Sequence, residues 1–191
     1  MATGYSLIEL VFVAGLVATL SAMAVPQTLA ALDDSRTLGA ARYMSARFQR
    51  ARMEAVMRSV EIGIRFVAVD ASYAYTTYAD GNQNGVRSAD IRSGVDVVIM
   101  PSEQLTDLFA HVDFGALPNL PPVDSGGTAP GSDPIRLGSA NIASFNPNGT
   151  STSGSVYIRG QRAQYVVRIY GDTGKTRIMR YDAVNKQWVP L

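Results

Sequence analysis

The amino-terminal part of the chain contains a continuous apolar run that ends at a proline. The run extends over residues 5–25, has Glu9 as its only charged residue and is followed by Pro26. An α-helix rises about 1.5 Å per residue, so this length spans about 31 Å, close to the hydrocarbon thickness of a bilayer. The sequence therefore predicts a transmembrane helix over residues 5–25.

The single charge in this helix indicates a function. A charged side chain inside a membrane helix costs about 2.5–3.5 kcal/mol on insertion scales, so it is rarely accidental. An ordinary secretory signal has a basic start and a cleavage site after its apolar core. Here the small residue Gly4 lies before the run, so cleavage after it would leave the helix in place. The alternative is a plain signal anchor in which Glu9 has no role.

The start of the run resembles a known processing signal. Residues 4–9, Gly-Tyr-Ser-Leu-Ile-Glu, resemble the class III signal Gly-Phe-Thr-Leu-Ile-Glu of type IV pilins and type II secretion pseudopilins. The resemblance implies that residues 1–4 are a leader, and that prepilin peptidase cleaves after Gly4 and methylates the new Tyr5 amine. Unlike the family's usual leaders, residues 1–4 have no Lys or Arg, which leaves the translation start and the determinant of orientation open.

Glu9 has a physical role in such a subunit. It lies one helical turn after Tyr5, on the same face. In a helical stack of subunits, Glu9 of one chain can pair with the Tyr5 amine of the next. Breaking a buried ion pair costs several kcal/mol, so this pairing would favour assembly.

A second helical segment follows the apolar run. Pro26 lacks an amide donor and is expected to kink or interrupt the helix. Residues 26–59 are then expected to continue it, because they are rich in good helix formers and contain one glycine. Their apolar side chains recur mostly every three or four positions, which indicates an amphipathic helix that packs on a sheet. This stripe consists of Leu29, Leu32, Leu38, Ala41, Met44, Phe48, Ala51, Ala55 and Val56.

The rest of the chain, residues 60–191, predicts a single β-rich domain. Residues 115–139 are rich in Gly, Pro and Ser and predict a long surface loop, and residues 172–174 predict a hairpin turn. A helix followed by strands favours the α+β class, with an antiparallel sheet packed on the helix. The predicted strands are β-branched or aromatic runs over residues 61–69, 73–79, 95–100, 155–159, 165–170 and 176–181.

Several segments of this domain resemble the GspH/FimT branch of the pseudopilins. The string Ala51-Arg-Met-Glu-Ala-Val56 resembles the end of that branch's long helix. Later segments match in order, with Gly174-Lys175 where the family usually has Gly-Arg. They are residues 132–135, 144–150, 154–158 and 172–177.

This resemblance implies a minor pilin or pseudopilin with a single inner-membrane span. Its pilin-like domain would be periplasmic, and its partners would be other pilins or pseudopilins in a periplasmic or surface filament. Its function would be mechanical, with no cofactor and no small-molecule substrate. The chain has no cysteine, so the core must hold the domain without a disulfide.

One loop resembles the start of a calcium site. Asp80, Asn82 and Asn84 alternate and are followed by a turn glycine, as in the first half of a calcium-binding loop. Such a loop needs an acidic ligand at its twelfth position, where this chain has Ile91, with Asp90 one place early. Asn and Gly are equally typical of exposed turns between strands, which is the favoured interpretation.

The sequence offers no pattern typical of an enzyme. It has no cysteine nucleophile, Gly-x-Ser-x-Gly motif or phosphate-binding loop, and His111 is its only histidine. We interpret His111 as structural and expect no catalytic activity.

Charge is distributed unevenly along the domain. Residues 61–154 carry ten acidic residues and four Arg, whereas residues 155–191 carry seven Lys or Arg and two Asp. Such asymmetry can mark a surface for polyanions. Some FimT-like minor pilins bind DNA near this hairpin, and Lys175, Arg177 and Arg180 lie in the comparable place. The alternative is docking onto acidic flanks of neighbouring pseudopilins. The favoured function is that of a minor pseudopilin in type II secretion, and the alternative is a FimT- or FimU-like minor type IV pilin in pilus assembly or DNA uptake.

Overall fold

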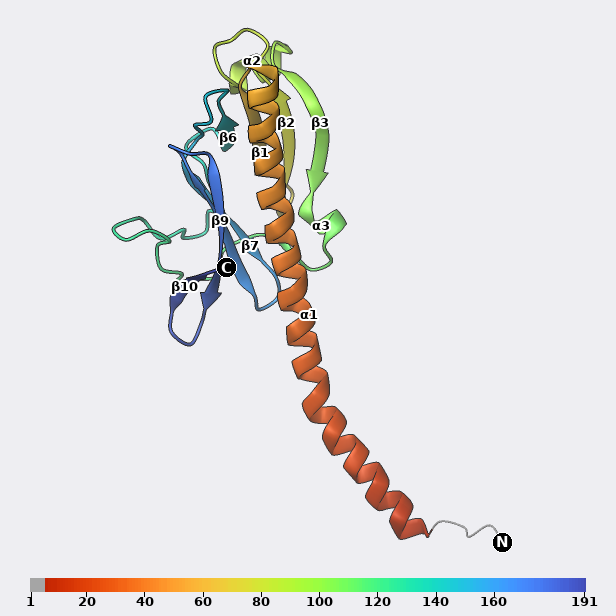
Figure 1. The fold of residues 1–191 in the computed structure, drawn as a ribbon. Coiled ribbons are helices and arrows are strands. Elements are labelled where there is room, and N and C mark those ends of the chain that lie inside the picture. The colour runs from red at the N-terminus through yellow and green to blue at the C-terminus, as the bar shows by residue number, and fades with distance from the viewer. Residues whose placement is uncertain (1–5) are drawn as a thin grey trace.

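A single long helix leads into the domain. The computed structural model describes residues 6–191, in which α1 runs without a break from Leu7 to Arg58. Its first half, residues 7–32, projects from the molecule, and its second half packs along the sheets (Figure 1). Pro26 lies inside α1, so of the two expectations at this residue the interruption is not observed and the kink stays a prediction. The axis of the projecting half curves away from that of the packed half (Figure 1).

The packed half of α1 buries one face, as its apolar periodicity predicts. The expected stripe is shifted at both ends, because Leu29, Leu32 and Val56 are 60%, 42% and 52% exposed. Leu29 and Leu32 lie on the projecting half of α1, and Val56 lies on the outer face of the packed half. Two polar residues take their place at the start of the buried face. The buried residues are Asp33, Thr37, Ala40, Ala41, Met44, Phe48, Ala51 and Ala55.

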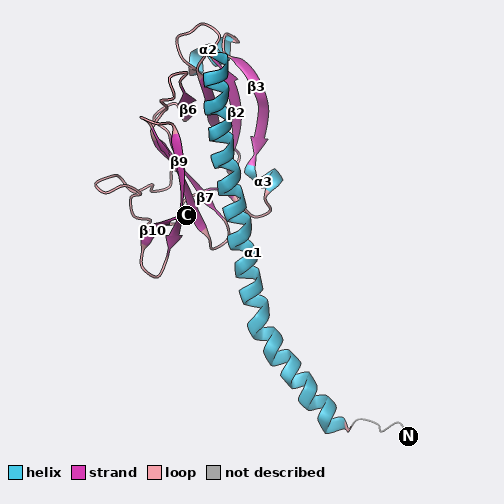
Figure 2. Ribbon diagram, viewed as in Figure 1, coloured by secondary structure: helices cyan, strands magenta, loops and turns pink. Residues whose placement is uncertain are grey.

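Two antiparallel sheets cover this helix face, where the sequence predicted one sheet (Figure 2). The first has the strand order β3-β2-β1-β6. Its central pair, β1 and β2, is a regular hairpin, whereas β2 and β3 pair with register shifts. The bounds are β1 Ile62–Val69, β2 Ser72–Ala79, β3 Val97–Gln104 and β6 Ile142–Phe145.

The second sheet has the order β10-β9-β8-β7-β4, and β5 also pairs with β7. The turn predicted at residues 172–174 joins β8 to β9. The bounds are β4 Asp113–Phe114, β5 Ile135–Arg136, β7 Gly154–Arg159, β8 Gln164–Tyr170, β9 Lys175–Asp182 and β10 Gln187–Pro190.

The sequence patterns did not predict the shortest strands and helices. Strands β4 and β5 have two residues each, too few to show an alternating pattern. Strand β5 lies inside the segment predicted as a loop over residues 115–139. Strands β6 and β10 and the short helices α2 (Ser88–Ser93) and α3 (Leu105–Leu108) were also not predicted.

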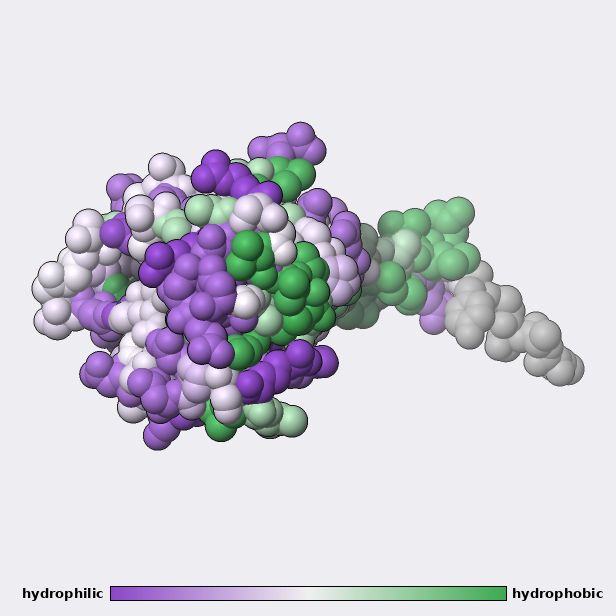
Figure 3. Space-filling view, turned by 90° about the horizontal axis from the view of Figure 1, so that it is seen from above, coloured by the Kyte–Doolittle hydropathy of each residue, from purple (hydrophilic) through white to green (hydrophobic). Residues whose placement is uncertain are grey.

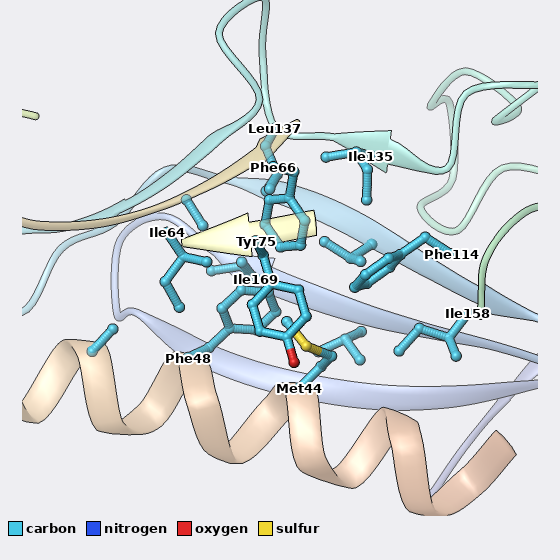
Figure 4. Close-up of a cluster of buried hydrophobic side chains, with 14 of the residues drawn as sticks. Met44, Phe48, Ile64, Phe66, Tyr75, Phe114, Ile135, Leu137, Ile158 and Ile169 are labelled. Carbon is cyan, nitrogen blue, oxygen red and sulfur yellow. The ribbon is translucent and has the colours of Figure 1, made fainter. Parts of the chain in front are cut away.

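The main core lies between α1 and the two sheets. Met44 and Phe48 of α1 meet Phe66, Tyr75 and Phe114 from the strands (Figure 4). The rings of Phe66 and Phe114 lie 5.4 Å apart in an edge-on arrangement that aromatic pairs prefer. The buried apolar area that this core provides explains how the domain holds together without disulfides.

A smaller core lies on the opposite face of the second sheet. It contains Leu120, Tyr157, Val166 and Met179, and Trp188 packs against it. The indole N–H of Trp188 donates to the carbonyl of Pro121 at 3.0 Å. The long loop between β4 and β5 therefore covers this face and is held to the carboxyl-terminal strand.

Candidate functional site

The projecting half of α1 has no partner within the described chain. All of residues 6–32 are exposed, and an 18-residue window reaches a mean hydropathy of 2.2 with none of it buried. Among the described residues α1 is the one helix long and apolar enough to cross a membrane. So much apolar surface is stable only where lipid or other helices cover it.

Glu9 lies at the start of this helix. It is exposed and occupies the first turn of α1, where the positive end of the helix dipole favours an acidic side chain. Gly4 and Tyr5 lie outside the described residues. The cleavage after Gly4 and the pairing of Glu9 with a Tyr5 amine therefore remain predictions.

Where α1 reaches the domain, an aspartate side chain accepts hydrogen bonds from a turn of the second sheet. The Asp33 carboxylate accepts three backbone N–H bonds, from Gln161 at 2.8 Å, Arg162 at 2.8 Å and Ala163 at 3.0 Å. Burial alone would raise the pKa of the Asp33 carboxyl, but these donors outweigh it and hold the pKa below its ordinary value of 3.8. Three charge-assisted bonds anchor the helix at this level.

The turn approaches α1 so closely that it needs a glycine. A Cβ placed on Gly160 would collide with the side chains of Thr37 and Asp33. Thr37 in turn donates its hydroxyl to the Asp33 carbonyl at 2.7 Å. The helix and the β7–β8 turn therefore pack in direct contact, with no space for a side chain at Gly160.

The next residue of the helix makes a second link. Asp34 accepts the Tyr165 hydroxyl at 2.9 Å and pairs with Arg180 at 3.2 Å. Burial, followed by the bond to Asp34, raises the pKa of Tyr165 to about 12, so this hydroxyl stays protonated and donates. The sequence analysis missed both aspartates. A signal was present, because they are the first charged residues after Glu9.

The upper part of the helix is tied to the first sheet. Glu103 of β3 accepts bonds from Tyr43 at 2.7 Å and Tyr75 at 3.0 Å, and forms a 3.0 Å ion pair with Arg47. A group of polar side chains spread along the helix thus fixes its position on both sheets.

A hydrophobic patch remains at the end of the domain opposite the projecting helix. Seen from that end, apolar side chains gather on an otherwise hydrophilic surface (Figure 3). Met53, Val56 and Met57 on the outer face of α1 are 60%, 52% and 75% exposed. Exposed apolar patches of this kind mark protein–protein contacts, and methionine adapts to varied partners.

The sequence matches a known family over most of this domain. The model of the family described as Type II transport protein GspH matches residues 40–173, more than two thirds of the chain. The match begins in the packed half of α1 and ends in the β8–β9 turn. This chain belongs to the GspH family.

Two further comparisons complete the findings. No curated protein matches the sequence. The fold of this GspH-family chain is similar to the crystal structure of the minor pseudopilin EPSH from the type II secretion system of Vibrio cholerae. The TM-score is 0.45 with 13% sequence identity, over 76% of this chain and 94% of that one.

The three basic residues proposed for DNA do not form one cluster in this GspH-family domain. Side chains alternate along β9, so Lys175 and Arg177 share one face and Arg180 lies on the other. Arg180 faces α1, where it pairs with Asp34. On the first face Arg177 pairs in register with Arg168, whose charge is compensated by Asp124 at 2.6 Å.

The calcium-like loop uses its aspartate to hold its own backbone. Asp80 is buried and accepts the N–H groups of Asn82 at 3.0 Å, Gln83 at 2.9 Å and Gly85 at 2.8 Å. The Asn82 amide faces Asp90 at 3.5 Å. Both carboxylate oxygens of Asp80 are therefore engaged in a turn.

Within residues 6–191 no group of three His, Cys, Asp or Glu side chains could hold a metal ion. His111 is exposed and has a left-handed backbone, with φ of 64°, in the loop between α3 and β4. It lies on the surface, so it is not part of the core.

Proposed function

We propose that this chain is a membrane-anchored minor pseudopilin, a structural subunit of the type II secretion pseudopilus with a periplasmic sheet domain. The observation that carries the proposal is the projecting half of α1. It is apolar and entirely exposed, and it continues without a break into the packed helix of a GspH-family domain. Neighbouring subunits or lipid must cover it.

In this proposal the helix assembles the filament. Prepilin peptidase removes residues 1–4 in the inner membrane, and the methylated Tyr5 amine of one subunit pairs with Glu9 of the next. Apolar helices then stack in the filament core. The Met53 and Met57 patch, at the other end of α1, offers a second contact for neighbouring subunits.

The anchoring of α1 supports a mechanical role. Asp33 accepts hydrogen bonds from the β7–β8 turn. Arg47 forms an ion pair with Glu103 of β3, and Tyr43 donates a hydrogen bond to the same carboxylate. A force applied to the projecting helix would therefore reach both sheets through a continuous helix and charged hydrogen bonds. A secretion filament that pushes cargo outward needs such a rigid connection.

The alternative is a FimT- or FimU-like minor type IV pilin that acts in pilus assembly or DNA uptake. It has less support, because β9 separates Lys175 and Arg177 from Arg180.

Deletion of the gene distinguishes the two functions. We expect loss of protein secretion, with pili and DNA uptake unchanged. Secretion should return with the wild-type gene and return poorly with Glu9→Ala. Loss of DNA uptake with normal secretion would contradict the proposal and favour the pilus alternative.

A further inference from the structure

The domain has an apolar rim at its membrane-proximal end. There the β9–β10 hairpin reaches the level at which the packed half of α1 starts (Figure 1). A cavity of about 560 Å³ separates them, lined by Ala30 and Asp33 of the helix and by Val184 and Leu191 near the carboxyl terminus. Val184 is 89% exposed and Leu191 is 64% exposed. Nothing in the described chain covers these two side chains.

The helix length gives the level of this rim relative to a bilayer. A hydrocarbon core of about 30 Å takes about 20 helical residues, from Leu7 to Pro26. The headgroup layer of about 5–7 Å takes about three to five residues more, to a level near Ala30. Ala30 lines the cavity beside the hairpin. If the projecting half of α1 stands along the bilayer normal, the hairpin tip would therefore lie near the depth of the phospholipid headgroups.

The charges at this end suit a headgroup layer. Arg162 and Lys186 are exposed and form no ion pair within residues 6–191. The neighbouring acids already accept bonds from the domain. Asp33 is held by the β7–β8 turn, Asp34 by Tyr165, and Asp182 by the N–H groups of Val184 at 2.9 Å and Asn185 at 3.2 Å.

We propose that the membrane-proximal surface of the domain, formed by Arg162, Val184, Lys186 and Leu191, rests on the phospholipid headgroups of the membrane that α1 spans. Val184 and Leu191 reach the boundary of the acyl chains, and the two cations meet lipid phosphates. The proposal rests on the proposed function, because it requires α1 to cross the bilayer. The contact is small and so reversible. It would hold an unassembled subunit in one orientation and release it into the filament.

A cysteine-free chain allows a direct test. The full chain is placed in phosphatidylcholine–phosphatidylglycerol nanodiscs that carry a lipid-bound quencher, with a fluorophore on a single cysteine. Ala183→Cys places the label at the hairpin tip. Ala89→Cys, an equally exposed alanine in α2 at the opposite end, is the control. We expect strong quenching at position 183 and none at position 89.

Surface variants then identify the contact. Burial of one valine favours the membrane-bound state of the hairpin about tenfold, so Val184→Asp should lower the ratio of quenched to unquenched label by about that factor. Lys186→Glu should lower it as well. Val97→Asp, at an exposed valine of β3, should leave it unchanged.

Two failures can be distinguished. If the chain integrates into the nanodisc but quenching is equal at positions 183 and 89, the proposed contact with the headgroups is wrong and the proposed function still stands. Failure of the full chain to enter nanodiscs would overturn both.

Discussion

The carboxylate of Asp33 on α1 accepts the backbone N–H of Arg162 at 2.8 Å, although 129 positions of sequence separate the two residues. The bond is one of three that the carboxylate accepts from the β7–β8 turn. It lies where the projecting helix enters the domain, so it links the part of the chain that assembles to the part that forms the sheets.

Loss of this carboxylate should weaken the domain. A chain beginning at residue 29 keeps every buried residue of α1, since burial starts at Asp33, and should be a soluble monomer. In this background Asp33→Ala leaves three N–H groups without their acceptor and should lower the free energy of unfolding by about 2–3 kcal/mol. Asp172→Ala, at an exposed turn, is the control for urea unfolding. Equal stability of the two variants would exclude the proposed anchor.

The same carboxylate should give a defined pH dependence. Its pKa in the folded chain lies below the ordinary value of 3.8. Its contribution to stability is therefore complete above that value and is lost as the pH falls through the folded pKa. The stability difference between wild type and Asp33→Ala should be constant from about pH 5 to 8 and narrow below about pH 4. A difference that narrows near neutral pH would point to another group.

A methyl group at Gly160 should separate the helix from the turn. Because the new Cβ collides with Thr37 and Asp33, Gly160→Ala should cost about 1–3 kcal/mol of unfolding free energy. At Gly115 the nearest atom to an added Cβ is Arg159 Cβ at 3.4 Å, an ordinary contact. Gly115→Ala should therefore be close to wild type in stability when both variants are compared by thermal unfolding. Wild-type stability of Gly160→Ala would show that the turn can move away.

Glu9 should matter for assembly rather than for membrane insertion. Glu9→Ala removes a charge that is costly in a bilayer, so the amount of membrane-inserted protein should be equal or higher. Incorporation into filaments should fall, because the neighbour's amine loses its partner. Co-purification with other pseudopilins measures this, and Ser21→Ala in the same helix is the control. Normal co-purification of Glu9→Ala would contradict the pairing.

The DNA alternative makes a different prediction. With a function in secretion, we expect the domain not to retard duplex DNA even at low salt, where attraction to phosphate is strongest. If retardation occurs, Lys175→Ala with Arg177→Ala should flatten the salt dependence by roughly one unit per lost contact. Arg180→Ala should leave it unchanged, because Arg180 faces α1. That pattern would favour the uptake function.

Much of the architecture could be read from local patterns. The apolar run over residues 5–25 and the helical periodicity from Ala41 to Ala55 record which side of a helix is covered, so both are visible in a short window. Six strands and the turn at residues 172–174 were predicted for the same reason, since alternation reports burial on a sheet. The family also followed from local strings, above all residues 4–9 and the segments of the β-rich domain.

The remaining features depend on contacts between distant residues. The anchoring by Asp33 and Asp34 follows from how the second sheet meets α1, and the sequence marks these aspartates only as the first charges after Glu9. The division into two sheets depends on strand pairing, and two-residue strands exist only because a neighbour provides the ladder. Strand alternation placed Lys175 and Arg180 on opposite faces, but only Asp34 across the interface showed which face meets the helix. The sequence by itself determined the helix, the main strands and the family. Tertiary packing decided which charges are anchors and which are free to meet a partner.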